Sequence, residues 1–138
     1  MLANTTVTKI FSFCYGHCLP GHSGKCAMQH GHTGRLEVEV SGVPFRDVVY
    51  TGMVVDYNDI KKWVDPIIAK LDHKYLNSIT EPNVGGEDVL VFDDGFPPTT
   101  ENMLHYIYTL LEDTPLFKGV VRLRLYESDT SYAEWRRE

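Results

Sequence analysis

Histidine and cysteine gather in one short part of this 138-residue sequence, and both residue types bind metal ions or move protons. All three cysteines and four of the six histidines fall between residues 14 and 32. An odd number of cysteines argues against a disulfide framework and favours a reducing compartment, which we expect to be the cytoplasm. We therefore treat this segment as a candidate site of metal or thiol chemistry.

One glycine separates His30 from His32, and residues two apart on a strand point to the same side. Two imidazoles placed in this way can bind one ion, and His17, near the end of the preceding strand, could supply a third ligand. Three histidines leave one position of a tetrahedral zinc ion open, which is typical of a catalytic site. Two alternatives stay open: a surface motif without an ion, and a closed structural zinc site made of Cys14, His17, Cys18 and His22.

Two further groups have side chains suited to proton transfer. Cys26 lies four residues before His30, where a metal cation would favour its thiolate form, although an inert loop cysteine is the simpler interpretation. Asp72 precedes His73, and a carboxylate beside an imidazole can fix the tautomer of the ring. Alone, such a pair is more often the polar end of a helix.

Glu127 ends an alternating strand pattern and shares its expected face with Leu123 and Leu125. A carboxylate on an apolar face is costly to bury without a partner. Glu127 therefore lies either in water at the edge of the sheet or against a ligand. A guanidine-like edge with two parallel N–H donors would pair with both of its oxygens.

The elements that must position these groups follow from periodicity. Alternating or β-branched runs predict strands at residues 6–13, 35–40 (extending back towards His30), 48–55, 120–127 and 131–136. Helical spacing predicts helices over 59–71, capped by Asp56 or Asn58, and from a Thr99 or Thr100 cap to about residue 113. Residues 14–29 and 77–98 are rich in glycine and proline and are expected to be mostly loop. The order β-β-α-α-β-β predicts the α+β class: a four-stranded antiparallel sheet with two helices on one face.

Composition limits the function classes. With 43% hydrophobic and 23% charged residues, we expect one globular domain over residues 1–138. The formal net charge of -6 argues against nucleic acid as a partner. No apolar run is long enough to span a membrane, and the first ten residues lack the pattern of a secretory signal.

Several motifs, in order, resemble those of the 6-pyruvoyltetrahydropterin synthase family, and among its branches the 6-carboxytetrahydropterin synthases of queuosine biosynthesis. The resemblance covers about residues 7–135. The motifs that carry it are Gly16-His17, Cys26-Ala27-Met28-Gln29-His30-Gly31-His32, Thr51-Gly52-Met53-Val54-Val55-Asp56-Tyr57, Leu71-Asp72-His73-Lys74-Tyr75-Leu76-Asn77, Pro98-Thr99-Thr100-Glu101-Asn102 and Tyr126-Glu127-Ser128.

This resemblance implies a tunnelling fold (T-fold), in which trimers close a β-barrel and two trimers stack into a hexamer with active sites between subunits. It implies that Zn²⁺ is bound by His17, His30 and His32. Cys26 would shuttle protons, with Asp72 and His73 of a neighbouring subunit as the relay. Glu127 would hold the pterin, and Thr99 and Thr100 would approach its ring.

The implied reaction converts 7,8-dihydroneopterin triphosphate into 6-carboxy-5,6,7,8-tetrahydropterin, with release of acetaldehyde and triphosphate. Three residues between Cys26 and His30 resemble the queuosine-pathway branch. The alternatives are a 6-pyruvoyl product, another pterin side-chain reaction on the same fold, or a pterin-binding module without catalysis. Some positions depart from the family pattern: Cys18 replaces an arginine, Gly34 replaces an aromatic residue, and Cys14 and Tyr15 replace small residues. The loss of the arginine leaves the triphosphate-binding residues open, with Lys25, Arg35 and Lys74 as candidates.

Overall fold

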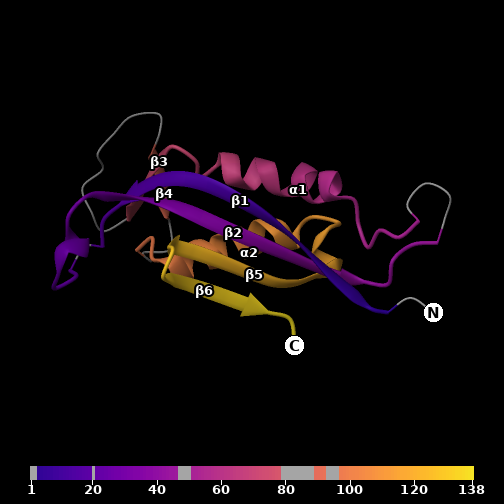
Figure 1. The fold of residues 1–138 in the computed structure, drawn as a ribbon. Coiled ribbons are helices and arrows are strands. Elements are labelled where there is room, and N and C mark those ends of the chain that lie inside the picture. Colours follow the sequence, from indigo (N-terminus) through magenta and orange to yellow (C-terminus); the bar gives the residue numbers. More distant parts are fainter. Residues whose placement is uncertain (1–2, 20, 47–50, 79–88, 93–96) are drawn as a thin grey trace.

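The computed structural model describes residues 3–19, 21–46, 51–78, 89–92 and 97–138 (Figure 1). Its strands are β1 (Thr5–His17), β2 (His30–Gly42), β3 (Lys74–Ser78), β4 (Val89–Phe92), β5 (Val120–Ser128) and β6 (Ser131–Arg136). Its α-helices are α1 (Tyr57–Ala69) and α2 (Thr100–Glu112), and two short 3-10 helices are η1 (Lys25–Ala27) and η2 (Phe117–Gly119). The prediction of the α+β class with two main helices is confirmed.

The described strands form one sheet in the order β4-β3-β1-β2-β5-β6, so it has six strands rather than the expected four. The β1–β2, β2–β5 and β5–β6 pairs are antiparallel, as expected, but β3 pairs with both β1 and β4 in parallel. Sequence periodicity missed β3 and β4 because both are short and border a segment rich in glycine and proline. A parallel pair that joins only Tyr15–His17 to Lys74–Leu76 leaves little periodic signal.

The hairpin of β1 and β2 is longer than predicted. Its antiparallel register runs from Thr5 opposite Gly42 to His17 opposite His30, so the expected loop at residues 14–17 is strand. The predicted strand at 48–55 is wrong for residues 51–55, which form turns and bends, and its first part lies outside the described residues. Gly52 explains the difference, because its φ of +88° is a left-handed conformation that breaks an extended strand.

Both helices begin at residues predicted as caps. The Asp56 side chain accepts a hydrogen bond from the Asn58 amide at 2.8 Å, and the Thr99 side chain accepts one from the Asn102 amide at 3.2 Å. Pro66 lies inside α1, which nevertheless continues to Ala69. Neither main helix of the described residues has the length and apolar run that a membrane-spanning helix needs.

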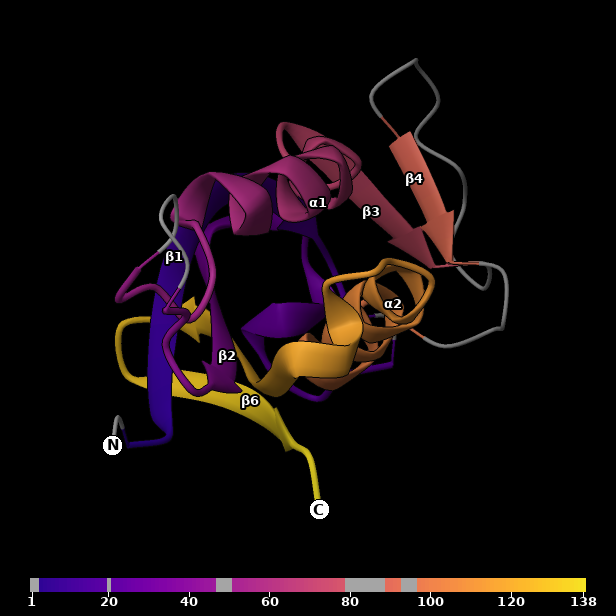
Figure 2. The ribbon, with the colours of Figure 1, turned by 90° about the vertical axis from the view of Figure 1, so that its right-hand side faces the viewer.

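The two faces of the sheet have opposite chemistry, as the alternation in the sequence predicts. Alternate residues of β1, β2 and β5 join buried residues of both helices in one apolar core, with members such as Phe13, Leu36, Val64, Ile107 and Leu123. On the other face, Arg122 is buried beneath Glu37 and Glu39, with which it forms ion pairs. Figure 2 shows the sheet curving from β6 through β2 to β3 and β4, with α2 inside the curve.

Gly34 of β2 packs against a buried aromatic ring of β1. It lies opposite Phe13, whose ring is 2% exposed and covers the glycine. A Cβ atom added at residue 34 would lie 2.9 Å from Cζ of that ring. The Phe13 ring therefore fills the space that a side chain at residue 34 would occupy.

We expect Gly34→Ala to lower the free energy of unfolding by about 1–3 kcal/mol, because Phe13 is enclosed and must leave its rotamer to admit the methyl group. Urea unfolding at fixed protein concentration measures the effect. The matched control is Gly31→Ala on the same strand, where the added Cβ would lie 3.4 Å from the Tyr15 carbonyl oxygen, an ordinary contact. Equal stability of the two variants would contradict this account of the hairpin.

Candidate metal centre

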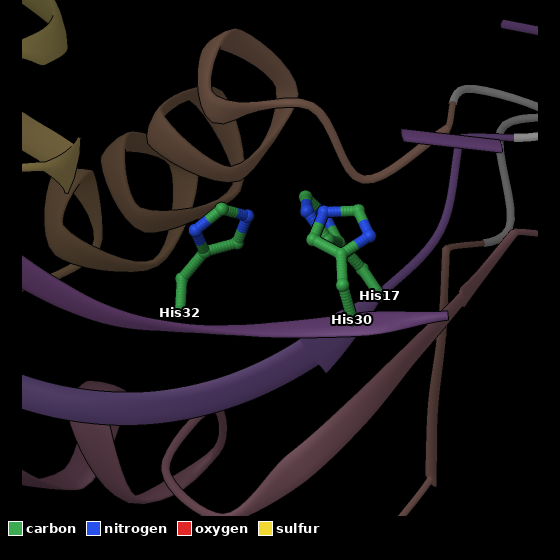
Figure 3. Close-up of side chains that lie close together, drawn as sticks. All are labelled: His17, His30 and His32. Atoms are coloured by element: carbon green, nitrogen blue, oxygen red, sulfur yellow. The ribbon is translucent and has the colours of Figure 1, made fainter. Parts of the chain in front are cut away.

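Three imidazoles meet on the core side of the β1–β2 hairpin, near its closed end. His17 of β1 lies directly opposite His30 of β2, and His32 follows two residues later on the same face. One ring nitrogen of each histidine can be chosen so that all three lie within 4.8 Å of one another. Figure 3 shows the rings turned towards a common space above the strands. The structure therefore brings together the three histidines that the sequence predicts as metal ligands.

Backbone carbonyl groups orient two of these rings. His17 Nδ1 lies 2.8 Å from the Pro98 carbonyl oxygen, and His30 Nδ1 lies 2.7 Å from the Met28 carbonyl oxygen. A carbonyl oxygen only accepts, so each Nδ1 carries the proton and each Nε2 has a free lone pair. Nε2 of His17 and Nε2 of His32 are both buried without a hydrogen-bond partner among the described residues. Unpartnered, inward-facing nitrogens of this kind fit a metal ion.

Burial favours the neutral form of His17 and His32. Desolvation lowers the pKa of His17 below that of a free imidazole, against the opposing effect of its hydrogen bond to Pro98. Desolvation also lowers the pKa of His32, partly offset by the Glu127 carboxylate. Neutral imidazole is the form that binds a metal ion, so burial favours the binding form of these two rings. A ligand set of three imidazole nitrogens suits zinc with an open fourth position.

Glu127 borders the imidazoles at the end of β5. The register between β5 and β6 shifts between Tyr126 and Ser128, and this irregularity includes the carboxylate-bearing residue. Glu127 Oε1 lies 3.8 Å from His32 Nε2, too far for a hydrogen bond, while Oε2 accepts one from the Thr100 hydroxyl at 2.9 Å. The sequence-predicted pair Glu127 and Thr100 is therefore beside the cluster.

Thr99 has a different place from Thr100. Its hydroxyl caps α2, and the preceding residue, Pro98, supplies the carbonyl that orients His17. Residues at the start of α2 thus contact both His17, through the Pro98 carbonyl, and the Glu127 carboxylate, through the Thr100 hydroxyl. Pro98 was not predicted as a site residue, although it is the first residue of the family motif that contains Thr99 and Thr100.

Tyr15 is a second residue that sequence reasoning missed. Its ring is 5% exposed and lies 5.3 Å from the ring of His17 and 5.5 Å from that of His32, measured between centroids. Burial, with a smaller contribution from Glu127, raises the pKa of Tyr15 far above its ordinary value, so the phenol stays neutral. The prediction of a loop from residue 14 hid it, because strand alternation through His17 would have placed Tyr15 on the imidazole face.

Asp72 and His73 form a rigid turn directly after α1. Asp72 Oδ1 accepts a hydrogen bond from the Cys14 amide at 2.9 Å and lies 3.0 Å from His73 Nδ1. The bond from Cys14 is the main reason that the pKa of Asp72 lies below its ordinary value. His73 adopts a φ of 59°, a left-handed conformation uncommon for a residue with a side chain, and its amide donates to the Cys14 carbonyl at 2.6 Å. Such conformations cluster at functional positions.

The structure does not bring this pair to the three imidazoles of the same chain. His73 lines an open pocket that residues of the hairpin, including Cys14 and His32, also border. Its side chain is 79% exposed, and among the described residues no hydrogen bond, ion pair or ring contact joins it to the three imidazoles. Cys26 lies in η1, between β1 and β2, and no contact among the described residues joins it to the imidazoles or to His73.

The alternative of a closed structural site is not supported. Cys14 is exposed on the face opposite the His17 ring, so the two cannot bind one ion. His22 Nδ1 accepts a hydrogen bond from the Gly24 amide, which closes a local turn. His17 instead groups with His30 and His32.

Solved structures share this fold. The chain is similar to 6-pyruvoyl tetrahydropterin synthase of Caenorhabditis elegans, with a TM-score of 0.77 over 99% of this chain and 98% of the other, at 21% identity. It is also similar to the Plasmodium falciparum protein of the same name, with a TM-score of 0.74 over 97% and 98% of the two chains, at 22% identity. At these identities the likeness shows a T-fold and nothing finer.

Sequence relatives are closer. The chain is 31% identical to the 6-carboxy-5,6,7,8-tetrahydropterin synthase of Haemophilus influenzae over 94% of its length and 97% of the relative's. It is 34% identical to the protein of the same name from Synechocystis sp., over 94% and 91%. The family described as 6-pyruvoyl tetrahydropterin synthase matches residues 6–138. The chain that holds these three histidines belongs to the 6-pyruvoyl tetrahydropterin synthase family of pterin synthases.

Proposed function

We propose that this protein is a zinc-dependent 6-carboxytetrahydropterin synthase. It converts 7,8-dihydroneopterin triphosphate into 6-carboxy-5,6,7,8-tetrahydropterin, releases acetaldehyde and triphosphate, and serves queuosine and related 7-deazaguanine biosynthesis in the cytoplasm. The observation that carries the proposal is the three-histidine cluster beside Glu127, in a chain whose relatives bear this enzyme's name. The three histidines would hold a metal ion, and Glu127 beside them would hold the pterin.

His17, His30 and His32 would hold the zinc ion through their three ring nitrogens. A zinc ion in this setting acts as a Lewis acid, which polarises substrate oxygens and eases deprotonation of hydroxyl groups. The protein's contribution is to favour neutral His17 and His32 through burial, and to orient His17 and His30 through the carbonyl groups of Pro98 and Met28.

Glu127 would bind the pterin ring. Its two carboxylate oxygens match the parallel N–H donors of the 2-amino group and N3, a bidentate arrangement. The hydroxyl of Thr100 donates to Oε2 and thereby fixes the plane of the carboxylate before substrate arrives.

Cys26 and His73 would exchange protons with the substrate's carbon atoms. The Asp72 carboxylate faces His73 Nδ1, which leaves Nε2 of that ring to take or give a proton. Because the His73 side chain is 79% exposed and no contact among the described residues joins it to its own chain's imidazoles, we place it in the active site of a neighbouring copy. The active site would then be complete only between subunits, in a trimer or a hexamer.

The sheet has edges that could accept such neighbours. β1 pairs with β3 only through Tyr15–His17, and Cys14 bonds the turn at Asp72 and His73, so in the described part of the chain residues 5–13 have an open edge on that side. β6 ends the strand order on the other side. Open strand edges of this length are normally covered, and pairing with another copy covers them.

The alternative on the same fold is a 6-pyruvoyl product, which the family's name itself suggests. The mass of the product decides between the two. A pterin-binding module without catalysis would bind the substrate and return it unchanged.

The metal prediction concerns His30. Zinc-replete wild-type protein should bind one zinc ion per chain, and His30→Ala should lose it on dialysis, because a two-histidine site lacks the third ligand. Elemental analysis of the dialysed proteins measures the metal, and circular dichroism checks the fold. His105→Ala is the matched control, since His105 lies on the exposed side of α2 and should leave the metal content unchanged. Full zinc retention by His30→Ala would contradict the site.

The catalytic prediction concerns Cys26. Wild-type protein incubated with 7,8-dihydroneopterin triphosphate should yield the carboxylated pterin and acetaldehyde, detected by mass spectrometry. Cys26→Ala should slow the reaction by about 10²-fold or more while the zinc content stays the same, because a proton-transfer group is lost. Cys18→Ala removes a buried thiol outside the proposed relay and should keep the rate. Unchanged substrate from zinc-replete wild-type protein would refute the proposed function.

The intersubunit relay predicts complementation between inactive variants. Cys26→Ala and His73→Ala should each be inactive alone, yet equal mixtures that exchange subunits should regain activity at about a quarter of the sites, where both required chains meet. The readout is product formation after co-refolding, compared with each variant refolded alone. If the mixture stays as inactive as its parts, Cys26 and His73 act within one chain.

A further inference from the structure

We propose that Tyr15 is a positioning residue of the metal centre. Its ring, on the opposite strand, holds the His32 imidazole in the orientation that metal binding requires. The inference rests on the proposed function, since it concerns the same three-histidine site, and it adds a residue of this chain to that site.

The three histidines differ in how their rings are fixed. His17 and His30 each have Nδ1 at a backbone carbonyl oxygen, at 2.8 and 2.7 Å. Nε2 of His32 is buried without a hydrogen-bond partner among the described residues, and an oxygen of Glu127 lies 3.8 Å from it. Histidines that bind metal ions nearly always have an outer partner that fixes the ring. For His32, the contact that the structure shows around the ring is with aromatic side chains.

The side chain opposite His32 supplies one such contact. Tyr15 is the antiparallel partner of His32, so the two side chains stand next to each other on the same face of the hairpin. Their ring centroids are 5.5 Å apart with 37° between the ring planes. The rings of His17 and His30, at 5.0 and 4.8 Å, close other sides of the His32 ring at nearly right angles. Rotation of His32 would therefore collide with an aromatic ring.

Tyr15 can do this because it is itself immobile. It is 5% exposed and packs against the ring of Phe13 at 5.5 Å, and Phe13 in turn fills the space above Gly34. A continuous series of contacts thus runs from Gly34 through Phe13 and Tyr15 to His32. The edge-on contact of Tyr15 with His17, at 5.3 Å and 86°, links the ring to a second ligand on the other strand. A small residue at position 15 would leave a cavity beside both imidazoles.

The test compares Tyr15→Ala with Tyr15→Phe. With Zn²⁺ measured by chelator competition, Tyr15→Ala should bind about 10–100-fold more weakly, as loss of an outer-shell partner does, while Tyr15→Phe should stay within about twofold of wild type. With Co²⁺ as a spectroscopic probe, the visible absorption of Tyr15→Ala should change in position or intensity, and that of Tyr15→Phe should match wild type. Rescue by phenylalanine assigns the effect to the ring and not to the hydroxyl.

Leu36→Ala is the control for a general loss of core packing. Leu36 is fully buried on β2, in the same core but outside the imidazole contacts, so its variant should lose stability and keep wild-type metal affinity and Co²⁺ spectrum. If Tyr15→Ala fails to fold, Tyr15→Leu keeps most of the volume without the flat ring and should show the same change in spectrum. Metal affinity and spectrum of Tyr15→Ala or Tyr15→Leu equal to those of Leu36→Ala would overturn the inference.

These measurements need no substrate, so the two proposals fail separately. A wild-type protein that binds zinc but forms no carboxylated pterin would refute the proposed reaction and leave the role of Tyr15 standing. A wild-type protein that binds no metal would refute both. If Tyr15→Phe lowers zinc affinity as much as Tyr15→Ala, the proposed role of the Tyr15 ring is refuted, and the proposed reaction is not affected.

Discussion

The pairing register of β1 with β2 is the constraint on which the candidate site depends. It puts His17 opposite His30 and Tyr15 opposite His32, so ligands from two strands reach one space. A shift by one residue would turn each of these side chains to the other face of the sheet. The apolar residues Phe11, Phe13 and Leu36, which point to the same face, resist such a shift because it would expose them to water. The core thereby sets the position of the metal ligands.

The site is also prepared by burial. Desolvation keeps His17 and His32 neutral, and the carbonyl groups of Pro98 and Met28 direct Nε2 of their partner rings inwards. The start of α2 contributes twice, through Pro98 and through the Thr100 hydroxyl on Glu127. A helix capped by Thr99 thus links the imidazole cluster to the carboxylate proposed as pterin anchor. These contacts connect His17 and Glu127 to the start of the same helix.

Much of this arrangement could be predicted from the sequence, for reasons that lie in local patterns. The His-Gly-His spacing, the alternation in residues 35–40 and the caps at Asp56 and Thr99 each follow from rules that act over a few residues. The short strands β3 and β4 could not be predicted, because parallel pairing of four or five residues leaves no period of its own. The strand at 51–55 was a wrong prediction, because β-branched residues there suggested extension while Gly52 sets a turn.

Tyr15 and His73 show where sequence reasoning ends. Tyr15 was hidden by glycine residues that suggested a loop, and its contact with His32 depends on the register of a distant strand. His73 was predicted as a relay group, but its exposed position, without contact to the imidazoles among the described residues, follows from the turn after α1 and the bonds of that turn to Cys14. Periodicity tells which face a residue takes within an element, and not which elements meet. The proposal that a second subunit completes the active site starts from this placement.

The central claim is that three histidines, and no cysteine, bind the metal ion with one position open. X-ray absorption at the zinc edge measures this directly on the wild-type protein. The account predicts three nitrogen neighbours with the pattern of imidazole and one further light atom, all near 2.0–2.1 Å. A sulfur neighbour at about 2.3 Å, from any of the three cysteines, would contradict it.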